Sequence, residues 1–189
     1  MNLHDPVGAR AVLLDHLRRH AVRTDGPFTL RSGEVSGWYL DARQSLYSGE
    51  ASLACGIALL DVIAKYDVDA VGGMTMGADP VALATAIAGE LTGAPLRAFS
   101  VRKAEKAHGS GGRIAGPLAP GDRVAVVEDT VTTGGALFEA AAAIREAGAR
   151  PVVLAVVVDR SGGAVAERAA QAGLPLKVLF KPVDLGQDQ

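Results

Sequence analysis

A stretch near the middle of the chain, VAVVEDTVTTGGA at 124–136, combines acidic, hydroxyl and glycine residues in a short order. An apolar run ends in two adjacent carboxylates, Glu128 and Asp129, and TTGG at 132–135 follows before an alanine-rich segment. Backbone N–H groups and hydroxyls at a helix start form a natural cradle for a phosphate monoester. The carboxylates suit the hydroxyls of a sugar such as ribose, or a hydrated Mg²⁺ ion. An acidic pair that only caps a helix is the alternative, which the attached TVTTGG disfavours.

A second stretch, VRKAEKAHGSGG at 101–112, places basic and titratable side chains beside glycines. These are Arg102, Lys103, Lys106 and His108, followed by Gly109, Gly111 and Gly112. Taken alone, such a stretch is usually a solvated loop. The whole chain has a formal net charge of −2, which argues against a nucleic-acid binder because such proteins usually carry a strong basic excess. The local charge therefore points to a small anionic ligand.

The elements that must position these stretches alternate between helix and strand. A short opening helix, with Leu14 and Leu17 on one face, is expected after Asp5 and Pro6. The stretch 28–42 is typical of two short strands about a Ser/Gly turn, and Ser48 can cap the next helix. Beyond it, strands are expected at 69–74, 97–101, 123–128, 151–159 and 176–180, and helices at 78–93, at 134–148 and in a segment ending near Gly173.

This alternation, with near-continuous apolar strands, predicts an α/β fold with three layers around a mostly parallel sheet. We see no repeat, linker or low-complexity tract, so 1–189 is expected to form one domain. Ligands of such sheets bind beyond the carboxyl ends of the strands. The stretches expected there, and so expected to surround one site, are 72–79, 101–108, 128–135 and 159–160.

Cysteine content and hydropathy exclude several classes of protein. The single cysteine, Cys55, excludes an internal disulfide and a cysteine-built zinc site, and its apolar helical surroundings predict a buried structural thiol. His4, His16 and His20 lie on or beside the first helix and are expected to be solvated. The N-terminus lacks a signal-peptide pattern and no apolar run is long enough to span a membrane. A cytoplasmic protein without membrane contact is therefore expected.

The run VVEDTVTTGG at 126–135 resembles the signature for phosphoribosyl pyrophosphate (PRPP) of the type I phosphoribosyltransferases. The pattern Arg-Lys-x-x-Lys-x-His-Gly at 102–109 resembles the catalytic loop of the orotate-specific members of that family. The stretch 28–43 resembles their N-terminal base-binding hairpin, and VVDR at 157–160 resembles the strand end that supplies an arginine to orotate. The pieces occur in the right order over about 28–160.

The resemblance implies a type I phosphoribosyltransferase-like fold in which about 1–45 and a C-terminal segment form a small hood over the base. It implies transfer of the 5-phosphoribosyl group from PRPP to orotate in pyrimidine biosynthesis, with Mg²⁺ bound through PRPP and through Glu128 and Asp129. It further implies a homodimer with shared active sites. In that dimer Lys103 serves its own subunit, while Arg102, Lys106 and His108 reach into the partner's site.

The same resemblance assigns the individual contacts. Those implied for PRPP are Arg31, Arg102, Lys103, Lys106, His108, Glu128, Asp129, Thr130, Val131, Thr132, Thr133, Gly134, Gly135 and Ala136. Those implied for orotate are Tyr39, Leu40, Thr132 and Arg160, and the catalytic set is Arg102, Lys103, Lys106, His108 and Asp129. A basic loop that closes over the leaving diphosphate would stabilise its growing charge, deliver a proton and exclude water.

The sequence departs from the family pattern in two places, at Arg31 and at Thr75–Met76. Arg31 stands where a lysine is common. Thr75 and Met76 stand where some members have an aromatic residue and a lysine, so backbone N–H groups are expected to hold more of the diphosphate. Trp38 and Tyr47 fit either a dimer interface or the core.

Two other functions stay open at this point. A phosphoribosyltransferase for a purine base such as adenine would share the PRPP motif, but it needs neither an arginine for a carboxylate nor this basic loop. A PRPP-sensing regulatory protein that binds nucleic acid would need an added helix-turn-helix domain or an extended basic face.

Overall fold

The centre of the computed structural model, which describes residues 2–29, 35–105 and 112–188, is a six-stranded sheet. Its order is β10–β9–β8–β5–β6–β7. The strands are β5 (Ala70–Met74), β6 (Arg97–Val101), β7 (Ile114–Ala115), β8 (Arg123–Val131), β9 (Arg150–Asp159) and β10 (Leu176–Phe180). Every neighbouring pair is parallel except β6–β7. The predicted α/β class with a mostly parallel sheet is confirmed.

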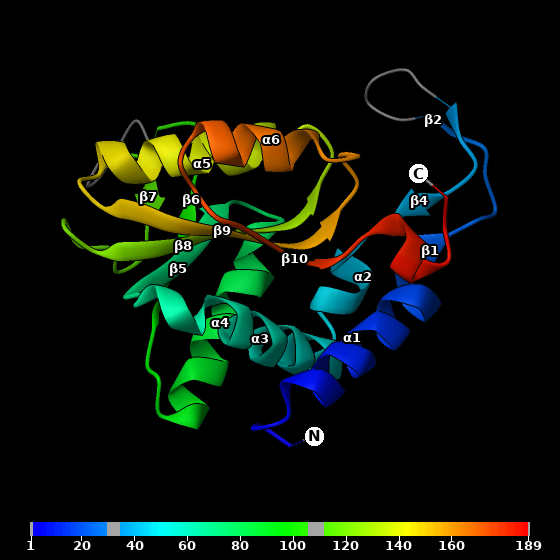
Figure 1. Cartoon of the computed structure of the whole chain (residues 1–189), viewed down its shortest axis with the longest axis horizontal. Coiled ribbons are helices and arrows are strands. Elements are labelled where there is room, and N and C mark those ends of the chain that lie inside the picture. The colour runs from blue at the N-terminus through cyan, green and yellow to red at the C-terminus, as the bar shows by residue number, and fades with distance from the viewer. Residues whose placement is uncertain (1, 30–34, 106–111, 189) are drawn as a thin grey trace.

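Helices cover both faces of this sheet, which gives the three expected layers (Figure 1). One face carries α5 (Gly135–Glu146) and α6 (Ala164–Gln171). The other carries α3 (Gly49–Ile63) and α4 (Ala78–Thr92), with α1 (Pro6–His20) packed on α3. The α1 helix begins as predicted, because Asp5 accepts a hydrogen bond from the Gly8 N–H at 2.8 Å. Its fully buried face is Ala9, Leu13 and Leu17, so Leu14 is only partly buried.

Two small antiparallel sheets lie to one side of the main sheet (Figure 1). In one, β1 (Val22–Arg23) pairs with β4 (Tyr39–Leu40); in the other, β2 (Phe28–Thr29) pairs with β3 (Val35–Ser36). We call these two sheets, with the residues between β3 and β4 and the C-terminal turn η2 (Pro182–Leu185), the hood. The hairpin predicted within 28–42 is confirmed, and the pairing of β4 with β1 is an addition. Trp38 and Leu40 of the hood join the main hydrophobic core.

The connections of the sheet place its switch point between β5 and β8. From β5 the chain runs outward through α4 to β6, whereas β8, β9 and β10 follow one another in the opposite direction. Crevices at the carboxyl ends of strands around such a point are the usual ligand sites of open α/β sheets. The loop after β5 and the turn after β8 therefore lie where a ligand is expected.

The cysteine and the histidines of the N-terminal part differ in burial. Cys55 is fully buried in α3, as predicted, and burial raises the pKa of its thiol to about 12. His4 and His20 are exposed, but the expectation for His16 was wrong: it is partly buried, with Nδ1 3.0 Å from Ser45 Oγ. Ser48 precedes α3 without capping it through its side chain.

Trp38 is buried and Tyr47 is 62% exposed, so the two residues have different environments. The short helices are α2 (Arg43–Leu46) and η1 (Ala64–Tyr66). Across the part of the chain that the structure describes, every helix is too short or too polar to span a membrane.

Candidate active site

The acidic pair lies inside β8 and not at its end. The sequence predicts that this strand stops at Glu128, but it continues to Val131, because Thr130 pairs with Val158 and Val131 with Asp159 of β9. That boundary was wrong. Glu128 is 5% exposed, whereas Asp129 is partly exposed. The pair is therefore held rigidly by the sheet near the switch point.

The turn after β8 has the geometry of an anion cradle. Gly134 has φ +71° and is the N-cap of α5, which begins at Gly135. A Cβ at Gly134 would lie 2.9 Å from Val165 Cγ2, so both conformation and space require glycine. The Gly135 N–H points to Thr133 Oγ1 at 3.4 Å. Thr132, Thr133, Gly135 and Ala136 are exposed, so the helix start is open to a ligand.

The loop after β5 approaches the acidic pair closely through Gly77. A Cβ on Gly77 would lie 2.6 Å from Asp129 Oδ1 and 2.8 Å from Glu128 Oε1. A side chain at this position would force the two carboxylates to shift, so Gly77 allows the crevice to be this narrow. The sequence reasoning did not assign Gly77 a role. The sequence feature that could have indicated this role is a glycine in the loop after β5, the strand that pairs with β8 and so lies beside the PRPP-like motif.

Hydrogen bonds shape the rest of this loop. The Thr75 N–H donates to the Val101 carbonyl at 2.8 Å, and Thr75 Oγ1 donates to Asp79 Oδ2 at 2.6 Å. The side chain of Thr75 is thus engaged within the loop, whereas Met76 is exposed. Asp79 Oδ1 and Thr130 Oγ1 are buried and lack a hydrogen-bond partner among the described residues. Both unpaired oxygens lie in the elements that border the crevice, Asp79 in α4 and Thr130 in β8.

Burial dominates the electrostatics of the acidic pair. Burial, together with the negative charges of Asp129 and Asp79, raises the pKa of Glu128 to about 9. Burial also raises the pKa of Asp129. The two carboxyls are too close and too buried to ionise fully together without a counter-charge. A bound cation, or the donated hydrogen bonds of sugar hydroxyls, would favour their ionised forms.

An arginine that the sequence reasoning did not single out lies near this pair. The pKa of Arg43 is raised, chiefly by its hydrogen bond to Asp41 and to a smaller extent by the charge of Asp129. The Arg43 Nε donates to Asp41 Oδ1 at 2.8 Å. An open hollow of about 490 Å³ is lined by Asp41, Arg43, Gln44, Tyr47 and Ser48. No sequence pattern marks Arg43, because its place near Asp129 depends on how α2 packs.

Three of the residues expected to contact a base lie in two places: Tyr39 and Leu40 in β4 of the hood, and Arg160 just after β9. Tyr39 is partly exposed and its ring lies 5.7 Å from that of Phe28, centroid to centroid. Leu40 is 6% exposed and its side chain packs in the hydrophobic core. Arg160 follows β9, and its Cζ lies 3.9 Å from the centroid of the Trp38 ring. The hood and the carboxyl end of β9 are thereby in contact.

The basic loop begins and ends at two residues, Arg102 and Arg113, that are joined by two hydrogen bonds. The Arg102 N–H donates to the Arg113 carbonyl at 2.7 Å, and Arg113 Nε donates back to the Arg102 carbonyl at 2.8 Å. Arg113 also pairs with Glu139 of α5. Lys103 is exposed and Arg102 is partly buried. The predicted residues Arg31, Lys106 and His108 lie outside the described residues.

A second hollow, an apolar groove of about 420 Å³, lies between the N-terminus and the ends of α3 and α4. It is lined by residues such as Leu3, Ile57, Leu60 and Leu96 and contains none of the predicted site residues. Its lining offers few polar groups for a phosphorylated sugar. The crevice between β5 and β8 remains the better candidate.

Comparisons with known proteins agree with this geometry. The family model for the phosphoribosyl transferase domain matches residues 54–178. The chain is 48% identical over 179 residues to an orotate phosphoribosyltransferase from Streptomyces avermitilis, which covers 95% of this chain and 98% of the relative. A crystal structure of the Mycobacterium tuberculosis orotate phosphoribosyltransferase is similar with a TM-score of 0.84 and 41% identity, covering 94% of this chain and 99% of that one.

A second crystal structure of the M. tuberculosis protein is in complex with PRPP. It is similar to this chain with a TM-score of 0.77 and 35% identity, and the match covers 95% of this chain and 92% of that one. Nearly the whole length of each relative is therefore represented in this chain.

Proposed function

The chain belongs to the orotate phosphoribosyltransferases, within the phosphoribosyl transferase domain family, and on that premise we propose how its own residues perform the reaction. It is a pentosyltransferase that transfers the 5-phosphoribosyl group of PRPP to orotate in pyrimidine biosynthesis, giving orotidine 5′-monophosphate and diphosphate. The observation that most supports our assignment of residues is the approach of Gly77 to the buried Glu128–Asp129 pair at the switch point.

The turn after β8 binds the phosphoribosyl part of PRPP. The N–H groups and hydroxyls at the start of α5 receive the 5′-phosphate, where the helix dipole is positive. Glu128 and Asp129 accept hydrogen bonds from the ribose hydroxyls. The proposed contacts in this motif are Glu128, Asp129, Thr130, Val131, Thr132, Thr133, Gly134, Gly135 and Ala136. Backbone N–H groups of the loop around Gly77 face the diphosphate, and Arg31, outside the described residues, is a further proposed contact.

Magnesium is the proposed cofactor, and the donor set fits it. Carboxylate oxygens are the hard ligands that Mg²⁺ prefers, and the ion is usually held by one or two of them together with substrate phosphates. The described residues contain no cluster of three metal-ligating side chains, so Glu128 and Asp129 would hold the ion only together with PRPP. When bound, Mg²⁺ neutralises charge on the diphosphate.

The basic loop serves the leaving diphosphate. Its negative charge grows as the bond to the sugar breaks, so cations placed beside it stabilise the transition state more than the ground state. Arg102 and Lys103 are the described members of the proposed set, and Lys106 and His108 lie outside the described residues. We assign proton delivery to this basic loop. Lys103 acts on its own subunit, and the other three act on the partner's site.

Orotate is assigned to the space between the hood and β9. Arg160 supplies a guanidinium whose planar N–H groups match a carboxylate or a ring carbonyl. Tyr39 and Leu40 line the base, Leu40 through its backbone because its side chain is buried, and Thr132 reaches the base from the turn after β8. The domain unit is the whole chain, since Trp38 and Leu40 of the hood share one core with α1 and α3.

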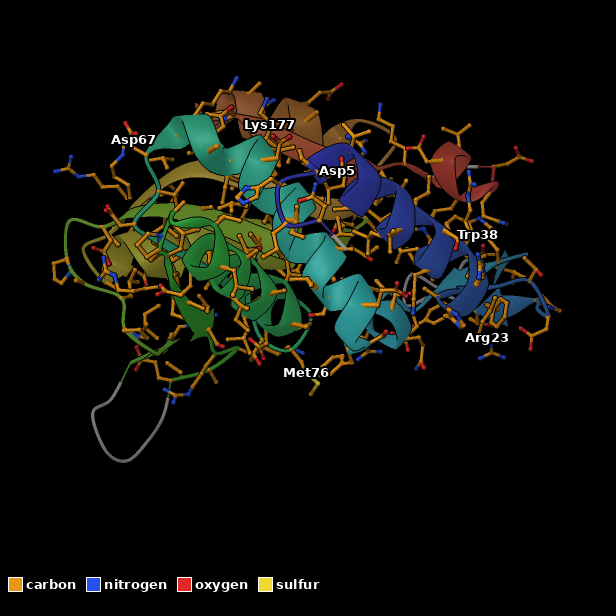
Figure 2. All side chains as sticks on the ribbon, turned by 90° about the horizontal axis from the view of Figure 1, so that it is seen from below. Asp5, Arg23, Trp38, Asp67, Met76 and Lys177 are labelled. Carbon is orange, nitrogen blue, oxygen red and sulfur yellow. The ribbon has the colours of Figure 1, made fainter. Side chains whose placement is uncertain are left out.

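A homodimer is proposed, and an apolar row on α4 supports it. Leu83, Ile87 and Leu91 follow one another at four-residue spacing and are 57%, 48% and 54% exposed. Met76 lies just before this helix and projects from the edge of the molecule in Figure 2. Single exposed apolar side chains are common, but a continuous row favours an interface. A second copy of this chain is the partner that shared sites require.

Two measurements test the dimer and its shared sites. Ile87→Lys should shift the sedimentation of the protein to the monomer, whereas Val183→Lys, at an apolar and even more exposed position on η2 (74% against 48%), should leave it dimeric. Mixing inactive Lys106→Ala with inactive Asp129→Asn should restore activity, because hybrid dimers then contain one complete site. A mixture that stays inactive, although hybrid dimers form, rejects the sharing. The expected cytoplasmic location stays a prediction, which cell fractionation would test.

The function itself is tested by initial rates with PRPP and Mg²⁺. Loss of orotate absorbance should require PRPP and stop on addition of EDTA, while uracil and adenine give no product. Asp129→Asn should reduce the rate by orders of magnitude with its far-UV circular dichroism unchanged. A wild-type protein that consumes no orotate at high enzyme concentration would reject the proposal.

A further inference from the structure

A cation–π contact joins the hood to the end of β9. The Cζ atom of Arg160 lies 3.9 Å from the centroid of the Trp38 ring. At this distance the guanidinium is in van der Waals contact with the face of the indole, which is the best aromatic partner for a cation. The two residues are far apart in the sequence, and Figure 2 shows Trp38 at the hood end of the molecule.

The backbone on each side of this contact is fixed. The Arg160 N–H donates to the Val131 carbonyl at 2.8 Å, which ties it to the last residue of β8. Ser36 Oγ donates to the Trp38 carbonyl at 2.8 Å and accepts from the Trp38 N–H at 3.3 Å. Trp38 is only 8% exposed and belongs to the hydrophobic core. The indole is therefore a rigid support and not a surface ring that follows the arginine.

The charge of Arg160 has no carboxylate partner in the described residues 2–29, 35–105 and 112–188. Its side chain is about half-buried, and burial lowers the pKa of its guanidinium. An anionic ligand would compensate for the hydration that this cation has lost, by pairing with its charge and accepting its hydrogen bonds. Because the indole covers one face of the guanidinium, the N–H groups at its edge remain the route to such a ligand.

We propose that Trp38 is the positioning residue of the orotate site: its ring fixes the plane of the Arg160 guanidinium so that two edge N–H groups meet the orotate carboxylate. This inference rests on the proposed function. A bidentate pair requires the planes of the guanidinium and of the carboxylate to be aligned. An arginine side chain has several rotatable bonds, so without a support its guanidinium would adopt several orientations. Trp38 does not touch the reacting atoms, so it acts through orotate binding and not through the chemical step.

Three variants separate a positioning role from a merely structural one. Trp38→Leu keeps apolar bulk but removes the ring face, and Trp38→Phe keeps a smaller face. Tyr66→Leu is the matched control, because Tyr66 also lies under cations, Lys65 and Lys177, but on η1 outside the candidate site. Trp38→Leu should raise the KM for orotate about 10-fold, a size typical of a partly desolvated cation–π contact.

The KM for PRPP should stay unchanged in Trp38→Leu. In Trp38→Phe the KM for orotate should return close to the wild-type value. Tyr66→Leu should match wild type in both constants. Equal rises in both KM values, an unchanged orotate KM, or no recovery with phenylalanine would each overturn the positioning role. If wild type itself consumes no orotate, the proposed function fails as well; if wild type is active, these results reject the inference alone.

A spectroscopic measurement on unmodified protein covers the case in which Trp38→Leu does not fold. Trp38 is the only tryptophan of the chain, so intrinsic fluorescence reports on its surroundings alone. Saturating orotate should change the emission with a midpoint equal to the Kd from equilibrium dialysis, and uracil, which lacks the carboxylate, should not. Arg160→Lys, which keeps charge but loses the planar stack, should abolish the change. Orotate binding without any change in emission would overturn the proposal.

Discussion

Replacing Glu128 with glutamine should stabilise the ligand-free protein while it weakens PRPP binding. Glu128 is buried in β8, where burial and the charges of Asp129 and Asp79 raise its pKa to about 9 from an ordinary value of 4.5. The site thus holds a carboxyl that the fold disfavours in its charged form. Such a cost is expected where a residue is kept for ligand binding and not for stability.

The sign and size follow from linkage. Between pH 4.5 and 9 the folded protein retains a proton on Glu128 that the unfolded chain has released. Stability is therefore highest below that window and falls as pH rises through it, by about 1.4 kcal/mol per pH unit. At pH 7.5, three units above the unfolded value, the upper limit of this loss is about 4 kcal/mol. Glutamine has no such proton equilibrium.

Urea unfolding without ligand, from pH 5.5 to 8.5, measures this effect. The stability gain of Glu128→Gln over wild type should grow with pH, while Glu146→Gln, at an exposed position of α5, should follow wild type. Mg²⁺ and PRPP should then protect wild type more than Glu128→Gln. A gain that does not vary with pH, or a variant less stable than wild type at pH 8, would refute the reasoning.

Three further predictions concern the packing of the site and of α3. Gly134→Ala should cost about 1–3 kcal/mol in urea unfolding, because its φ of +71° disfavours a side chain and the new Cβ would meet Val165; unchanged stability would contradict this. Gly77→Ala should raise the KM for PRPP, since a Cβ there would lie 2.6 Å from Asp129 Oδ1; an unchanged KM would exclude the close approach. Cys55, whose pKa burial raises to about 12, should react with a disulfide reagent only after unfolding; fast reaction in native protein would contradict its burial.

The strand and helix alternation was predictable because most strands are continuous apolar runs with glycine or proline between elements. The end of β8 was not. Glu128 and Asp129 have weak strand preferences taken singly, and pairing with β9 keeps the chain extended through them up to Val131. The place of the site could therefore be predicted from the sequence, but not that its two carboxylates lie inside a paired strand.

In the candidate site, too, local features could be predicted from the sequence, whereas contacts between distant segments could not. The PRPP-like motif is local, so its glycine at the start of α5 could be predicted from residues 126–135 alone. The approach of Gly77, the place of Arg43 and the stack of Trp38 on Arg160 all join segments distant in sequence. Such contacts depend on the packing of the hood and of α4, for which a single sequence carries no direct signal.

The most direct test of the central claim is a competition in one vessel. Wild-type protein with Mg²⁺ and limiting PRPP would be given equal concentrations of orotate, uracil and adenine, and the nucleotides would be identified by mass. We predict orotidine 5′-monophosphate as the one nucleotide formed, in equal amount to the diphosphate released. Formation of uridine or adenosine monophosphate instead, or of no nucleotide, would contradict the account.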